Sequence, residues 1–211
     1  MSESNTPESI PLTEWMESWK TVSDKLLHKI TYDYLYYMGY GDILKTYCKE
    51  HKVPFNGNKI LDIRSNARSL ISQGKIDLAR ECLIEFDVEL IDTNFDVNYY
   101  LLAQEAIESM QNTSEDKVLT FIGNKLYPIT KLNKLEYLKD ILEFLVFNTG
   151  DNIKKKRNKL ASFINNKIIE KYETNENTLK NIVNEIIEGE EKLSNKYKFP
   201  SFKNYLEDKC E

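Results

Sequence analysis

Apolar residues recur along most of the chain at spacings of three and four, which is typical of α-helices with one buried side. The first such stripe ends at Gly39, a residue suited to the left-handed conformation that closes a helix. Its members are Leu27, Ile30, Tyr34, Leu35 and Met38. Asp42 is predicted to cap a second short helix. The inward side of that helix should consist of Ile43, Leu44, Tyr47 and Cys48. Together the two predict an antiparallel helical hairpin.

The middle of the chain repeats this pattern. Residues 72–75 predict a turn between helices over about 59–71 and 76–86, and a longer helix is expected over 99–110. Ser114 is predicted to cap the next helix. That helix should stop before Pro128, because proline lacks the backbone donor that a helix interior requires.

The last third opens with the most hydrophobic stripe, over residues 132–147. Two charged amphipathic helices are then predicted around 160–168 and 179–187. The aromatic segment over 195–206 contains Pro200 and is expected to dock as an extended piece or a short turn. Residues 1–12 are predicted to form a flexible tail. The pattern as a whole predicts an all-α fold, an elongated bundle of eight to nine helices with almost no strand.

Composition agrees with this fold class. Among 211 residues there are only 7 glycines and 5 prolines, too few for the many turns of a β fold. The three cysteines, Cys48, Cys82 and Cys210, form no CxxC and are expected to be free thiols. The polar, acidic start predicts no signal peptide. No apolar run approaches the roughly 18 residues of a membrane span, so an intracellular soluble protein is expected.

Charge and motifs favour no enzymatic class. The formal charge of −5 argues against general nucleic acid binding. His28 and His51 have no zinc-ligand spacing, and no phosphate-loop, dinucleotide or hydrolase motif is present. We therefore assign no catalytic, cofactor-binding or metal-binding residue. The basic run Lys154–Arg157 could be a nuclear localisation patch or an anion contact, but a solvated outer surface of a helix is the favoured interpretation.

Five tyrosines crowd the first stripe and its turn: Tyr32, Tyr34, Tyr36, Tyr37 and Tyr40. Base stacking needs a basic groove, whereas Asp33 and Asp42 flank this run. A lone hairpin cannot bury so much apolar surface by itself, so other parts of the chain or another chain should cover it. Tyrosine is also enriched in protein interfaces.

The segment around this turn resembles a LisH motif. The matching positions are Leu27, Ile30, Tyr34, Leu35, Gly39 and Tyr40. Thr31 replaces the usual second aliphatic residue, and Leu44 stands where a small residue is commoner. Downstream, residues 63–94 resemble a CTLH domain, with matches at Arg64, Ile71, Gly74, Ala79 and Leu90 and in the triplet 92–94. Residues from about 115 to 206 resemble a CRA domain.

The three motifs in this order resemble the LisH–CTLH–CRA scaffold subunit of the glucose-induced-degradation (CTLH) ubiquitin ligase. The resemblance implies a LisH region over 13–57, a CTLH domain over 58–114, a CRA domain over 115–206 and a tail over 207–211. It also implies that the final CRA helices fold back on the LisH region. The implied LisH pairing surface consists of Leu27, Ile30, Tyr34, Leu35, Met38, Gly39 and Tyr40. The implied second assembly surface includes Leu101, Gln104, Leu138, Leu142 and Leu145.

The implied function is a non-catalytic adaptor in cytoplasm and nucleus, without cofactors and without nucleic acid or membrane partners. Its implied partners are the SPRY-type and RING-type sibling subunits and an armadillo-repeat subunit. LisH pairing could be homomeric or heteromeric. The alternative is a LisH-type dimeric helical adaptor in an unrelated assembly, such as a microtubule-associated one.

Overall fold

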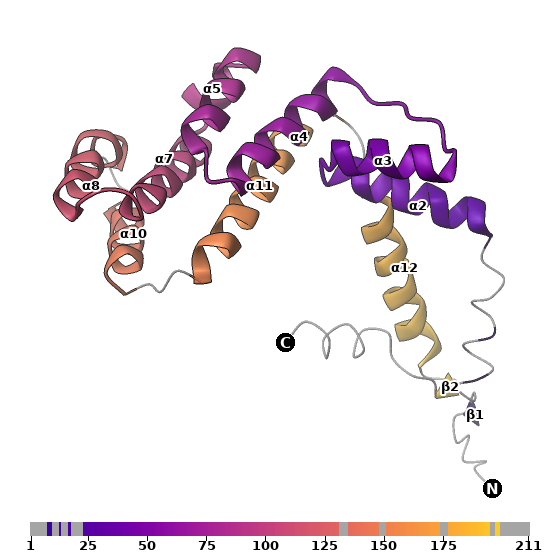
Figure 1. The fold of residues 1–211 in the computed structure, drawn as a ribbon. Coiled ribbons are helices and arrows are strands. Elements are labelled where there is room, and N and C mark those ends of the chain that lie inside the picture. Colours follow the sequence, from indigo (N-terminus) through magenta and orange to yellow (C-terminus); the bar gives the residue numbers. More distant parts are fainter. Residues whose placement is uncertain are drawn as a thin grey trace, which may run out of the picture. The chain divides into compact units, whose positions relative to one another are not determined.

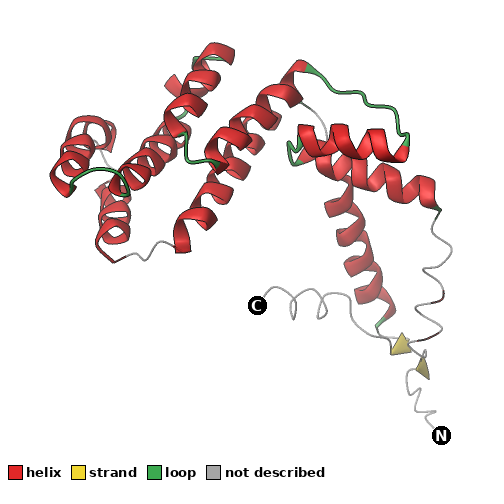
Figure 2. Cartoon of the chain, in the orientation of Figure 1, coloured by secondary structure: helices red, strands yellow, loops and turns green. Residues whose placement is uncertain are grey.

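In a computed structural model of the protein, the structure describes residues 8–9, 13, 17, 23–130, 135–147, 151–173, 177–194 and 197–198. These residues form eleven α-helices, one π-helical turn and one pair of two-residue strands (Figure 1). Nine of these helices have seven residues or more, which confirms the predicted all-α fold (Figure 2). The longer helices are α2 (Asp24–Tyr37), α3 (Gly41–His51), α4 (Lys59–Ser72), α5 (Ile76–Phe86), α7 (Phe95–Met110), α8 (Glu115–Phe121), α10 (Leu135–Phe147), α11 (Asp151–Tyr172) and α12 (Thr178–Leu193).

The chain divides into two compact units, one drawn from residues 1–37 and 176–211 and the other from residues 38–175. In the first unit α12 packs against α2, as expected for a late helix that returns to the early part of the chain. The strands β1 (Glu8–Ser9) and β2 (Tyr197–Lys198) pair in parallel. Two residues of the expected flexible tail thus join the aromatic segment near the other end of the sequence.

The unit of residues 38–175 contains two hydrophobic cores. The first lies where α4 packs against both α5 and α11, and its members include Ile71, Leu83, Leu101, Ile164 and Ile168. The second lies between α7, α8 and α10 and includes Ala106, Leu126 and Ile141. Helix α7 supplies residues to both cores, because its apolar residues surround most of its circumference rather than forming one stripe.

The start of α3 differs from the sequence prediction. The helix begins at Gly41 with Tyr40 as its N-cap, so Asp42 lies inside the first turn and does not cap the helix. A carboxylate there still stabilises the positive end of the helix. Leu44 and Cys48 are buried as predicted, but Ile43 is 56% exposed, so its predicted place on the inward side is wrong.

Helical structure extends beyond one predicted stop and includes one unpredicted helix. Helix α5 ends at Phe86 as predicted, and the short helix α6 (Glu89–Asp92) follows it. The helix that begins after Ser114 continues through the π-turn Ile122–Leu126 into α9 (Tyr127–Thr130), so the expected stop before Pro128 is wrong. Pro128 directly follows the π-turn, an irregularity in the i→i−4 hydrogen-bond ladder of this helical segment. The Ser114 hydroxyl makes no capping hydrogen bond.

The turn between α4 and α5 forms as predicted. Gly74 has a φ of +77°, the left-handed region that glycine adopts most readily. Two backbone N–H groups of this turn bond to the end of α4. The Gly74 N–H donates to the Ile71 carbonyl oxygen, and the Lys75 N–H donates to the Leu70 carbonyl oxygen. Among the described residues, no helix is both long and apolar enough to cross a bilayer.

Candidate functional site: protein-interaction surfaces and polar anchors

The helices α2 and α12 form an amphipathic surface without a core of its own. They pack against each other, and the Thr178 hydroxyl donates a hydrogen bond to Asp33 Oδ2 at 3.1 Å. In the part of the chain that the structure describes, neither helix contains a buried residue. We call their apolar positions the α2/α12 face. It consists of Leu27, Ile30, Tyr34 and Leu35 on α2 and of Leu179, Ile182, Val183, Ile186 and Ile187 on α12.

The residues predicted to form a pairing surface separate into two environments. On α2, Leu27 is 50% exposed, while Ile30, Tyr34 and Leu35 are half-buried. Met38, half-buried itself, and the next two residues belong to the other compact unit. There Gly39 is buried and Tyr40 packs its ring against Arg68, whose guanidinium carbon lies 4.7 Å from the ring centroid. Gly39 and Tyr40 thus hold the turn against α4 and α11, whereas Leu27, Ile30, Tyr34 and Leu35 belong to the α2/α12 face.

The turn at Gly39 packs closely against α11. Gly39 has a φ of +72°, and a Cβ added there would lie 2.5 Å from Asn165 Oδ1. Only glycine therefore satisfies both the backbone conformation and the available space. The predicted left-handed residue at this position is confirmed.

Behind this turn, Arg64 makes a buried polar anchor between α4 and α11. Its guanidinium donates to Asn165 Oδ1 at 3.0 Å and to Glu173 Oε2 at 3.0 Å. The Arg64 side chain is fully buried and that of Glu173 is 5% exposed. A charge so deeply buried is tolerated only when it is paired and hydrogen-bonded. The sequence analysis gave Arg64 as a position of the CTLH match and did not place it inside the fold. Its helical phase with Ile60, Ala67 and Ile71 is the signal that indicates an inward side chain.

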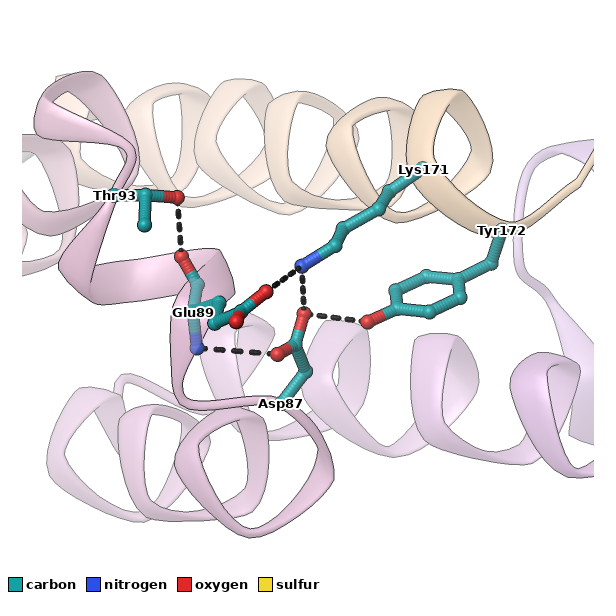
Figure 3. A network of polar contacts seen from close by, with 5 residues as sticks. All are labelled: Asp87, Glu89, Thr93, Lys171 and Tyr172. Atoms are coloured by element: carbon teal, nitrogen blue, oxygen red, sulfur yellow. Dashed lines mark hydrogen bonds and ion pairs between the residues drawn. The ribbon is translucent and has the colours of Figure 1, made fainter.

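A second polar network fastens the end of α11 to the segment between α5 and α6 (Figure 3). Asp87 Oδ2 accepts hydrogen bonds from Lys171 Nζ and from the Tyr172 hydroxyl, each at 2.5 Å. Asp87 Oδ1 accepts from the backbone N–H of Glu89 at 3.1 Å. Lys171 also lies 3.4 Å from Glu89 Oε2. Sequence analysis missed this network, because its members lie more than 80 residues apart and no local pattern connects them.

The network shifts the ionisation of its members. The hydrogen bond from Lys171, followed by that from Tyr172, lowers the pKa of the Asp87 carboxyl group. The same contact with Asp87 raises the pKa of Lys171 and of the Tyr172 phenol. Each shift favours the protonation states that make the network, namely an ionised Asp87, a charged Lys171 and a neutral Tyr172.

Acid should therefore weaken the fold through Asp87. A lowered pKa in the folded state adds stability that is present above the unfolded value of about 3.9 and lost as pH falls through the folded value. Urea unfolding between pH 6 and pH 2 should show that Asp87→Asn flattens this loss. The matched control is Asp62→Asn, which removes a carboxylate whose partner Lys45 lies 3.0 Å away at an exposed site. A wild-type pH profile in Asp87→Asn would contradict the role given to this carboxylate.

The basic run does not lie wholly on an outer surface. Lys154 and Lys155 are exposed, but Arg157 Nη2 lies 2.5 Å from Glu108 Oε2, and Arg157 Nη1 donates to the backbone oxygen of Ser72. Lys156 places its ammonium 3.9 Å from the centre of the Phe144 ring. The favoured interpretation as a solvated surface is thus wrong for Lys156 and Arg157, since each contacts a neighbouring helix.

The second predicted assembly surface is mostly inside the fold. Leu101, Gln104 and Leu138 are 0%, 4% and 8% exposed, and Leu145 packs against the second core. Leu142, at 38% exposed, lies on α10 near the more exposed Val146 and Phe147. Leu142, Val146 and Phe147 line a shallow apolar hollow together with Tyr127. Lys139 and Glu143, which form an ion pair, lie among its lining residues. Among the five predicted residues, Leu142 is therefore the one that is exposed.

The remaining polar candidates are unremarkable in geometry. His51 closes α3 with its ring 4.6 Å from that of Tyr47, and His28 is half-buried on α2. Gly123, Asn124 and Lys125 lie within the π-turn. Across the residues described, no three His, Cys, Asp or Glu side chains are arranged to hold a metal ion. No protein-family model matches the chain.

Proposed function

We propose that this protein is a non-catalytic helical scaffold that pairs through the α2/α12 face with a second helical unit of the same kind. One observation carries the proposal: α2 and α12 are amphipathic helices that contain no buried residue. Two helices in contact cannot enclose a core, so their apolar stripes are stabilised when another pair of helices covers them. The tyrosines of α2 also suit a protein interface.

We further propose that the assembly is a ubiquitin ligase of the glucose-induced-degradation type, on the strength of the sequence resemblance. There the chain would link the SPRY and armadillo-repeat arm, which receives substrates, to the RING subunits. The end of α10, with Leu142, Val146 and Phe147 exposed, is the proposed second contact region. Holding substrate and ubiquitin donor in one particle raises their effective concentration, with no chemistry contributed by the scaffold itself.

Substituting Leu35→Asp should disrupt the pairing. A carboxylate buried in an apolar interface without a partner costs several kcal/mol, while Leu35 is only half-buried within the chain and no residue of α2 belongs to a buried core. Pulldown of the tagged protein from its own cells, followed by mass spectrometry, should show loss of the helical partners. Light scattering of the purified protein should show loss of any self-association.

The matched control is Lys29→Asp, an exposed position on the opposite side of the α2 stripe. It should leave the bound proteins and the particle mass unchanged. If Leu35→Asp retains the wild-type set of partners and the wild-type mass, the pairing role of this face is wrong. Recovery of tubulin or dynein regulators without a RING subunit would instead favour the unrelated microtubule-type assembly.

A further inference from the structure

We draw no further inference here: the strongest candidate, the shallow apolar hollow that Leu142, Val146 and Phe147 form with Tyr127 at the end of α10, belongs to the contact region already proposed, and nothing in the structure shows which partner covers it.

Discussion

Arg64→Ala is expected to lower the free energy of unfolding by about 3 to 5 kcal/mol, as found when one member of a buried ion pair is removed. The substitution leaves the carboxylate of Glu173, 5% exposed, without the guanidinium 3.0 Å away. It also removes the donor from Asn165, which is 2% exposed. Urea unfolding followed by circular dichroism measures the change. Many domains have a total stability of only about 5 to 15 kcal/mol, so the variant should be markedly less stable.

Two controls separate a buried charge from lost packing. The double variant Arg64→Met/Glu173→Leu replaces both members with apolar side chains and should recover much of the loss, since the desolvation penalty disappears with the charges. Lys45→Ala removes an exposed partner of Asp62 and should change stability little. A loss in Arg64→Ala no greater than that in Lys45→Ala would show that the pair does not anchor α4 to α11.

Gly39→Ala is expected to destabilise the same region by about 1 to 3 kcal/mol, the usual cost of placing a side chain in the left-handed conformation. The Cβ would also press on Asn165 Oδ1, the atom that accepts the hydrogen bond from Arg64. Because the two positions share Asn165, the effects of Gly39→Ala and Arg64→Ala should not add. Thermal unfolding of both single variants and the double variant measures this coupling.

The matched control for Gly39 is Gly123→Ala in the π-turn. No heavy atom lies within 4 Å of a Cβ built at Gly123. Alanine there should leave stability unchanged or raise it by about 0.5 kcal/mol, because it restricts the unfolded chain. Destabilisation of equal size at both glycines would mean that neither the left-handed backbone nor the contact with Asn165 explains the effect at Gly39.

The expected losses of stability in Gly39→Ala and Arg64→Ala arise at the same place, where residues 38–40 contact α4 and α11. Gly39 packs on Asn165, Tyr40 packs on Arg68, and Arg64 binds Asn165 and Glu173. Arg64 therefore joins α4 to α11 and to Glu173 within this unit, which explains why a single side chain should matter so much to its stability.

Sequence alone determined the elements of this protein. Helical period, the glycines at 39 and 74 and the scarcity of turn residues predicted most of the helices and the all-α class, because these signals act over a few residues. The sequence also indicated that Leu27, Ile30, Tyr34 and Leu35 form one apolar stripe. The stop that it misplaced, at Pro128, and the unpredicted helix α6 involve short helical turns whose stability depends on their neighbours.

Only the tertiary structure decided which apolar and charged residues lie inside. Leu101 and Gln104, expected on an assembly surface, are core residues, whereas Phe147, at the end of the most hydrophobic stripe, is 82% exposed. Arg157 forms an ion pair with Glu108, 49 residues away in sequence, and Arg64 forms one with Glu173, 109 residues away. Helical phase shows which residues share a side of a helix but not which helix covers that side. Burial and ion pairing depend on that choice of neighbour, which is made when the helices pack.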